Sequence, residues 1–306
     1  MKPEISTISG LFFIEYFAKI WKADCYDNRG TNMKIVALAE NKSIDNRLAA
    51  IHGLSVYIET PKHKLLFDVG PDDTFISNAG ALGIDLAEID TVVISHGHYD
   101  HGGALARFFV MNDKAKIYIR QQAFEPHYHK VAFVKTFIGL NPDFADNERV
   151  IFTDETLRID NEIFIFSDVE ETSDTKSSRA LLKMRDGKYE QDDFIHEQSL
   201  IITSEGKAVL LTGCSHRGIA NILTAAEKHQ PNINYVLGGF HLYNPTTKVS
   251  EPSETITRLA SDLMQHDSVF YTCHCTGKKA LRIMYSIMGE KLQYMSAGTV
   301  IEIPKS

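Results

Sequence analysis

The sequence predicts an α/β fold of the αββα type, in which two mixed β-sheets pack face to face and helices cover their outer faces. Two observations support this fold class. The chain divides into two halves, and in each half strand-like segments come before or between helical ones. Apolar strand-like runs in both halves end in short loops that contain glycine and histidine. No low-complexity tract interrupts the pattern, so we expect one domain over residues 33–306, preceded by an N-terminal extension over residues 1–32.

The first half is expected to supply one sheet and its helices. Two strand-like segments flank a turn at Pro61-Lys62. Ala104, Leu105 and Phe108 recur with the spacing of an amphipathic helix. A short helix followed by a loop is expected at 79–86. The expected strands are 33–38, 53–59, 64–68, 91–95 and 116–119.

The middle of the chain, residues 120–195, has a less regular pattern. Strand-like runs occur near Ile151 and at 163–166, among several loop signals. Long irregular segments in a compact domain are usually functional. We therefore expect a substrate lid or a specificity insert here.

The second half begins with a hairpin at 199–203 and 207–212 around the turn Ser204-Glu205-Gly206. Strands and helices then alternate, and the last helix ends at Gly289. The expected helices are 217–229, 254–265 and 277–288, and the expected strands between them are 234–237 and 268–272.

The composition limits the classes of partner. The 306 residues are 43% hydrophobic and 24% charged, with a formal net charge of −8. An acidic surface disfavours nucleic acid, whose binding needs a basic face, and no stretch is long and apolar enough to span a bilayer. We therefore expect a small-molecule substrate and neither a nucleic-acid nor a membrane partner. A small anionic substrate remains compatible with this charge, and so does a homo-oligomer.

The four cysteines indicate a reducing compartment. Cys273 and Cys275 flank a histidine, and Cys214 lies two residues before another. This placement differs from the disulfide framework of a small secreted domain. The N-terminal segment also lacks the pattern of a secretory signal, because Glu15 and Lys19 interrupt its apolar run. We expect a cytoplasmic protein.

The most informative motif is a His-x-His-x-Asp-His sequence directly after an expected strand. It supplies three imidazoles and one carboxylate within six residues. Such groups are costly to leave without partners, and a metal ion satisfies all of them at once. The motif residues are His96, His98, Asp100 and His101.

Three further loops with histidine follow strands of the second half, at His216, His241 and His274. The carboxyl ends of strands in an open α/β sheet lie on one edge, where such folds place their sites. We therefore expect these histidines to converge on the first motif.

Convergence of the loops predicts a site for two divalent cations about 3.5–4 Å apart. Both ions would lower the pKa of bound water toward about 7, so that a nucleophile exists at neutral pH. One ion would be held by His96, His98 and a third histidine, either His216 or the alternative His196. The other ion would be held by Asp100, His101 and His274.

Other residues have expected supporting or catalytic roles. Asp68 ends a neighbouring strand and is expected to orient a ligating imidazole. Asp100 and His241 are the catalytic candidates, with His241 serving either as a ligand or as a substrate contact. Cys273 and Cys275 are expected to pack around His274. The remaining histidines are expected on the surface or in the lid: His52, His63, His127, His129, His229 and His266.

An anion site is expected where the last loop meets the last helix. Thr276 precedes the helix, and Lys278 and Lys279 begin it. A helix amino terminus with two lysines attracts negative charge. The alternative is a basic turn that is simply solvated.

Taken in order, these motifs resemble the metallo-β-lactamase superfamily. Within it, the chain is similar to the subfamily named for dihydropterin–(ribofuranosyl)aminobenzene-phosphate synthase, over roughly residues 33–303. The resemblance rests on the following segments: His52-Gly53-Leu54-Ser55, Leu66-Phe67-Asp68-Val69-Gly70, residues 95–101, Gly213-Cys214-Ser215-His216, Gly238-Gly239-Phe240-His241 and His274-Cys275-Thr276-Gly277. Two positions depart from the wider pattern. Ile51 stands where a glutamate is expected, and Cys214 stands where many superfamily hydrolases have a metal-bridging aspartate.

The resemblance implies an αββα metalloenzyme with two divalent ions, usually zinc, with manganese, magnesium or iron as alternatives. It implies a reaction on a small anionic, phosphorylated metabolite, either by hydrolysis or by transfer from a pterin diphosphate. A hydrolase of phosphodiesters or lactones is an alternative, and a metal-binding sensor without catalysis is another. A diiron redox protein is disfavoured, because such proteins carry a glutamate at the position of His98 and a flavin domain.

Overall fold

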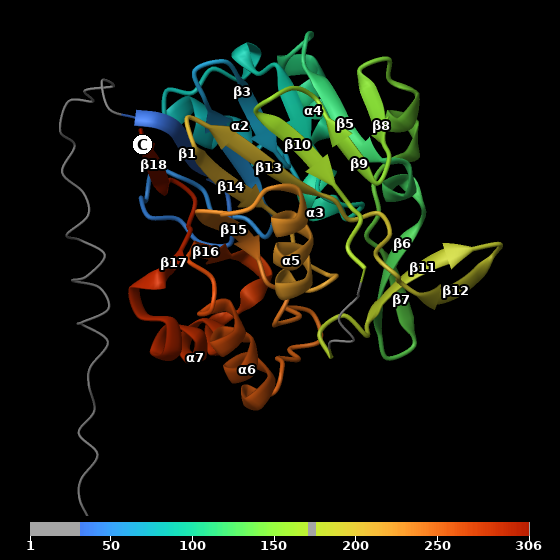
Figure 1. Cartoon of the computed structure of the whole chain (residues 1–306). Helices are drawn as coiled ribbons and strands as arrows, with labels where there is room; N and C mark the ends of the chain where they lie inside the picture. Colours follow the sequence, from blue (N-terminus) through green and yellow to red (C-terminus); the bar gives the residue numbers. More distant parts are fainter. Residues whose placement is uncertain (1–30, 171–175, 306) are drawn as a thin grey trace, which may run out of the picture.

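Two mixed sheets face each other in the computed structural model of the chain, which describes residues 31–170 and 176–305 (Figure 1). The first sheet has the order β18-β1-β2-β3-β4-β5-β8. Its strands from β18 to β3 are antiparallel, and those from β3 to β8 are parallel. The strands are β1 (Thr31–Ala39), β2 (Ser55–Glu59), β3 (Lys64–Phe67), β4 (Thr91–Val93), β5 (Lys116–Arg120), β8 (Val150–Thr153) and β18 (Val300–Pro304).

The second sheet has the order β17-β16-β15-β14-β13-β10-β9. The strands from β14 to β17 are parallel, and the remaining pairs are antiparallel. The strands are β9 (Thr156–Arg158), β10 (Ile163–Phe166), β13 (Ser199–Ser204), β14 (Lys207–Leu211), β15 (Tyr235–Gly239), β16 (Val269–Cys273) and β17 (Leu292–Tyr294).

Helices cover the outer faces of both sheets, which completes the αββα sandwich predicted from the sequence. The helices are α2 (Thr74–Ala81), α3 (Tyr99–Gly102) and α4 (Leu105–Met111) in the first half, and α5 (Ile219–His229), α6 (Ser253–Leu263) and α7 (Lys278–Met288) in the second. Short 3-10 turns are η1 (Leu86–Glu88), η2 (Gln121–Phe124), η3 (Pro142–Asp146), η4 (His274–Thr276) and η5 (Gly289–Lys291). Within the described ranges, every helix is too short or too polar to cross a membrane.

Three apolar layers hold the sandwich together. The layer between the sheets includes Val56 from the first sheet and Leu200 from the second, both buried. Phe75 of α2 and Phe108 of α4 pack in the layer outside the first sheet. A third layer packs α5, α6 and α7 against the second sheet. Each large apolar side chain buried in this way contributes about 1.5–3 kcal/mol.

A smaller antiparallel sheet of order β12-β11-β6-β7 projects beside the sandwich (Figure 1). Its strands are β6 (His127–Val131), β7 (Val134–Phe137), β11 (Leu181–Arg185) and β12 (Lys188–Gln191). The expectation of one insert over 120–195 was therefore partly wrong. Strands β8, β9 and β10 lie inside that range, but they belong to the edges of the two main sheets. There they help to cover the apolar faces of the sandwich.

Two other boundaries differ from the prediction. Helix α2 begins at Thr74, not in the range 79–86, because its buried residues Phe75, Asn78 and Ala79 follow helical spacing from that point. The amide of Thr74 also donates to the carboxylate of Asp72 as the helix begins. Strand β1 begins at Thr31, two residues before the expected domain boundary, and residues 1–30 lie outside the described part of the chain.

Candidate metal centre

The loops that follow β4, β14, β15 and β16 meet at one edge of the sandwich. Four residues at the ends of strands in this region adopt left-handed backbone conformations, although none is glycine. Such conformations cost about 1–3 kcal/mol each and tend to occur at functional sites. The four residues are Asp68 (φ 60°), Ser215 (φ 57°), His241 (φ 45°) and His274 (φ 50°).

The structure brings together the first predicted set of ligands, His96, His98 and His216. One nitrogen atom from each lies within 4.8 Å of the others, and all three side chains are buried. Nε2 of His96 lies 3.4 Å from Nε2 of His216. Two nitrogens bound to one tetrahedral zinc ion, each about 2.05 Å from it, lie about 3.3–3.4 Å apart. The spacing of these imidazoles therefore fits a shared cation.

The second predicted set also converges. Nε2 of His274 lies 3.3 Å from Oδ2 of Asp100 and 3.3 Å from Nε2 of His101. Sγ of Cys214 lies 3.3 Å from the same His101 nitrogen. The sequence analysis treated Cys214 only as a departure from the superfamily pattern. The structure places its sulfur among the ligand atoms, so Cys214 is a further candidate ligand.

The protonation states of the first set suit a cation. Burial and the neighbouring imidazoles lower the pKa values of His96, His98 and His216 well below the usual range. These rings are therefore neutral at pH 7, and only neutral imidazole offers a lone pair to a metal. Nε2 of His98 is buried without a hydrogen-bond partner in the described residues, and so are both ring nitrogens of His241. The residues present fit two divalent ions, and the sulfur of Cys214 favours soft ions such as zinc.

Asp100 and His274 form a charged pair within the second set. Burial alone would lower the pKa of His274, but the hydrogen bond with Asp100 and nearby negative charges raise it to about 9. Burial alone would raise the pKa of Asp100, but the charge of His101 and the hydrogen bond with His274 hold it below its usual value. Asp100 is therefore a carboxylate at neutral pH, the form that binds a cation.

Buried carboxylates hold the turns that carry the ligands. Oδ2 of Asp68 accepts from Nδ1 of His101 at 2.6 Å, the contact that its predicted supporting role requires. Glu197 accepts from the backbone amides of His216 (2.7 Å) and Arg217 (2.9 Å). Glu40 accepts from the backbone amide of His274 at 2.8 Å. Neither glutamate was expected at the site from the sequence.

Members of both sets, His98 and His216 of the first and Asp100 and His274 of the second, line a cavity of about 500 Å³. The opposite wall comes from the small sheet and its flanks, through Val131, Phe137, Ile138 and Leu181. A third side is formed by residues 244–246. Within the described residues, the lining includes no lysine or arginine. The cavity therefore combines a potential cationic floor with an apolar wall.

The expected anion site lies outside this lining. The hydroxyl of Thr276 accepts from the amide of Phe240 (2.9 Å) and pairs with the hydroxyl of Thr272 (2.6 Å). Nζ of Lys279 donates to the carbonyl of Glu251 at 3.0 Å. Lys278 begins α7 and does not line the cavity either. These contacts tie the last loop to its neighbours, and anion binding by the three residues stays a prediction.

Three residues with expected surface, lid or packing roles also line the cavity. The ring of His52 stacks on that of His274 with centroids 4.6 Å apart, and its Nε2 lies 3.4 Å from Oδ2 of Asp100. His129 and Cys275 also line the cavity. The His-Gly-Leu-Ser motif pointed to His52, because it was part of the resemblance. His241 lies as expected beside the ligands, with its ring 4.2 Å from that of His216.

Comparisons with known proteins agree with the geometry. A family model for the metallo-beta-lactamase superfamily matches residues 49–172. An uncharacterized protein of Methanocaldococcus jannaschii is 30% identical over 241 residues, which are 76% of this chain and 86% of that protein. The chain belongs to the metallo-beta-lactamase superfamily.

Two similar proteins have names that describe an activity. The 7,8-dihydropterin-6-methyl-4-(beta-D-ribofuranosyl)-aminobenzene-5'-phosphate synthase of Methanocaldococcus jannaschii is 26% identical, over 89% of this chain and 97% of the synthase. The crystal structure of Tm1679, described as a metal-dependent hydrolase of the beta-lactamase superfamily, is 28% identical with a TM-score of 0.75. That match covers 89% of this chain and all of the hydrolase.

Proposed function

We propose that this protein is an enzyme dependent on two divalent cations that acts on a small anionic, phosphorylated metabolite, by hydrolysis or by group transfer. One observation carries the proposal. Two sets of ligand atoms converge, His96–His98–His216 and Asp100–His101–His274 with Cys214, and members of both sets line one cavity. Zinc is the first choice for the ions, because the set combines imidazole, carboxylate and thiol donors.

The candidate ligands have different roles in the proposed site. Bound divalent ions supply Lewis acidity and lower the pKa of water, which makes a nucleophile available at neutral pH. His96, His98 and His216 contribute neutral donors, so their ion keeps its full positive charge. Asp100 contributes a negative donor, and the buried network around Asp68 keeps the His101 ring in a fixed orientation.

The cavity suits a substrate with a charged end and an apolar body. Because the described lining holds no lysine or arginine, attraction of a phosphate would fall to the two cations. Val131, Phe137 and Leu181 offer the apolar surface on which a flat or aliphatic body would rest.

His241 is suited to handle the proton of the leaving group. Its ring lies against that of His216, and both of its nitrogens are buried without partners among the described residues. A ring nitrogen in this position can donate a proton to the departing oxygen or hydrogen-bond the substrate.

Group transfer of the synthase type is the narrower form of this proposal. It is favoured by the alignment with the M. jannaschii synthase, which spans nearly the whole of both chains. The hydrolytic form is favoured by the similarity to Tm1679. A sensor without catalysis is the alternative of another class, and it predicts cation binding without turnover.

Elemental analysis of protein purified without added metal, followed by a substrate panel, tests the proposal. We expect about two equivalents of divalent metal per chain and turnover on at least one phosphodiester, diphosphate, lactone or dihydropterin diphosphate. His216→Ala should lose at least one equivalent and most of the activity, whereas His266→Ala, which lies after α6 and outside the cavity lining, should keep both. A protein that is fully active without metal would overturn the proposal, and metal binding without any turnover would favour the sensor.

A further inference from the structure

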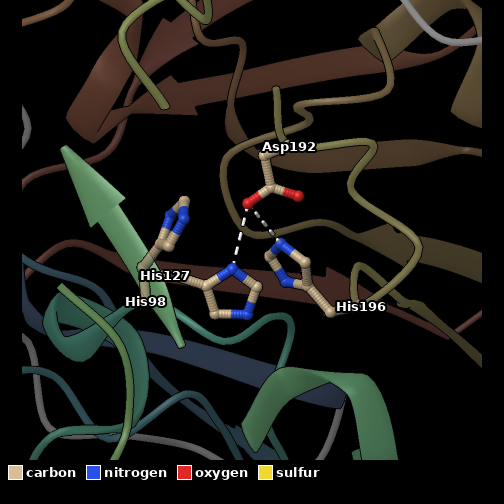
Figure 2. A group of neighbouring side chains, drawn as sticks. All are labelled: His98, His127, Asp192 and His196. Carbon is tan, nitrogen blue, oxygen red and sulfur yellow. Dashed lines mark hydrogen bonds and ion pairs between the residues drawn. The ribbon is translucent and has the colours of Figure 1, made fainter. Parts of the chain in front are cut away.

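A second cluster of histidines lies behind the first set of ligands. Figure 2 shows His127 and His196 next to each other, both linked to Asp192, with His98 beside them. All four side chains are buried. His127 belongs to β6, whereas Asp192 and His196 lie in the segment between β12 and β13. The cluster thus joins the small sheet to the turn that carries His98.

Asp192 is the centre of the cluster. Its Oδ2 accepts hydrogen bonds from Nδ1 of His127 (3.0 Å) and from Nε2 of His196 (3.3 Å). Its Oδ1 accepts from the backbone amide of Phe194 at 2.9 Å. Both carboxylate oxygens are therefore used, and the position of His196 is fixed by a buried acceptor.

The other nitrogen of His196 is also used. Its Nδ1 accepts a hydrogen bond from the backbone amide of Gly97 at 3.0 Å. A nitrogen that accepts from an amide carries no proton, so the proton of the neutral ring is on Nε2, where it can be donated to Asp192. The contacts form a directed chain from Gly97 through His196 to Asp192.

Gly97 is the residue between the ligands His96 and His98. A Cβ atom at this position would collide with the carbonyl oxygen of Ala123 and with Nε2 of His127. The turn between the two ligands is therefore pressed against the cluster, and its amide is held by His196. A shift of this turn would move both imidazoles.

The cluster could also be read as a third cation site, because the four side chains have one ligand atom each within 4.8 Å of the others. The hydrogen bonds argue against that. Coordination through Nε2 of His196 would require that nitrogen to lose the proton that the Gly97 contact assigns to it.

We propose that His196 and Asp192 are positioning residues of the metal centre, which act by holding the Gly97 amide and thereby the geometry of His96 and His98. This inference rests on the proposed binding of a cation by those two histidines. His196 is thus assigned a role in place of direct ligation. Outer residues of this kind typically change metal affinity by about 10–100-fold.

Two replacements of His196 separate its two contacts. In His196→Asn, the amide oxygen falls near the place of Nδ1 and can accept from Gly97, but the contact with Asp192 is lost. In His196→Gln, the amide nitrogen falls near the place of Nε2 and can donate to Asp192, but Gly97 loses its acceptor. A third variant, Asp192→Asn, removes the negative charge that keeps the Nε2 proton directed at residue 192.

Zinc affinity would be measured by competition with a chelator, along with the visible spectrum of the cobalt(II) form and the unfolding temperature of the metal-free protein. We expect His196→Gln and Asp192→Asn to weaken zinc binding by about 10–100-fold and to alter the cobalt spectrum. His196→Asn should stay within about threefold of the unchanged protein, although the metal-free forms of both His196 variants should lose similar stability.

The outcomes are distinct. Unchanged affinity and spectrum in His196→Gln would overturn the positioning role while leaving the proposed function intact. Loss of one whole metal equivalent in all three variants would overturn it in favour of a third cation site. Failure of the unchanged protein to bind zinc or cobalt at all would overturn the proposed function and this inference together.

Discussion

Single carboxylates set the positions of the ligand-bearing turns. Asp68, Glu197 and Glu40 each accept a backbone amide at or next to a ligand, and each is almost fully buried. A buried acceptor that receives amide hydrogens stabilises a backbone conformation that would otherwise be unfavourable, such as the left-handed one at Ser215 and His274. The rigidity of the metal centre therefore depends on residues that touch no substrate.

Replacement of Glu197 tests this dependence. Burial raises the pKa of Glu197 to about 7, and its two oxygens accept from the amides of His216 and Arg217. Glu197→Gln keeps one acceptor and points an amide group at the other donor, so we expect a loss of about 1–3 kcal/mol in the free energy of unfolding. Urea unfolding measures the loss.

The matched control is Glu302→Gln on β18, where the side chain is exposed. It should change the free energy of unfolding by less than about 0.5 kcal/mol. Equal stability of the two variants would contradict the role given to Glu197.

At the scale of elements, the loops at the strand ends that carry the candidate ligands could be predicted from the sequence. The distant residues that hold those loops in place could not. A strand followed by a glycine or histidine loop is visible locally, so the turns at His96, His216 and His274 were placed correctly from sequence. Glu40 supports His274 from 234 residues away, and His127 reaches the cluster behind His98 from the small sheet. Local patterns carry no information on such distant pairs.

The lack of local information on distant contacts also explains the errors in the predicted elements. The short strands β8, β9 and β10 have three or four residues each. Strand-like runs were expected near β8 and at β10, but such short runs do not show which sheet a strand joins. Their assignment to the main sheets depends on pairing with β5 and β13. His127 was placed in the lid because β6 was not recognised as a strand with one buried face.

Two turns in different sheets are joined by an ion pair that gives stability a pH dependence. His63, between β2 and β3, lies 2.7 Å from Asp160, between β9 and β10. Burial lowers the pKa of His63, but the hydrogen bond from this ring to Asp160 and the charge of Asp90 outweigh burial and raise it. The pKa of Asp160 is lowered, since its hydrogen bonds outweigh its partial burial.

These two pKa shifts determine how the stability of the fold depends on pH. A raised histidine pKa stabilises the fold below the unfolded value of about 6.5, and the stabilisation is lost as pH rises through the folded pKa. The stabilisation from the lowered pKa of Asp160 is present above the unfolded value of about 4, and it is lost as pH falls through the folded pKa. We therefore expect the pair to contribute up to about 1 kcal/mol between pH 4 and 6.5. Thermal unfolding of the metal-free protein at pH 5.5 and 8.5 measures it.

In His63→Gln, the difference in unfolding temperature between the two pH values should shrink relative to the unchanged protein. His266→Gln is the comparison variant, because His266 forms an ion pair with Glu227 of helix α5 that does not join the two sheets. An unchanged pH dependence in His63→Gln would contradict the assignment.

At the scale of the whole molecule, the cavity of the candidate metal centre is shared between the sandwich and the small sheet. The sandwich supplies the candidate ligands, and β7 and β11 supply apolar side chains. Under the proposed function, the superfamily scaffold would set the chemistry and the added sheet would select the substrate.

Phe137 tests this division. It lines the cavity from β7, and we expect Phe137→Ala to raise KM about tenfold with little change in kcat, because an apolar contact binds the substrate and transition state alike. Steady-state kinetics on the substrate found in the panel measures both constants. Phe133→Ala is the control, since Phe133 is 97% exposed and does not line the cavity.

If kcat fell while KM stayed constant, the small sheet would contribute to the reaction itself. That result would contradict the separation of chemistry from selection.

The pairing of β1 with β18 has a practical consequence. Thr31 lies opposite Pro304, so the first and last strands of the sandwich run side by side in opposite directions (Figure 1). A short linker between those strands would close the chain into a ring, and the ring could be reopened at the exposed β6–β7 hairpin. Such a circular permutant would show whether the loops that carry the candidate metal ligands still assemble when the strands follow one another in a different order along the chain.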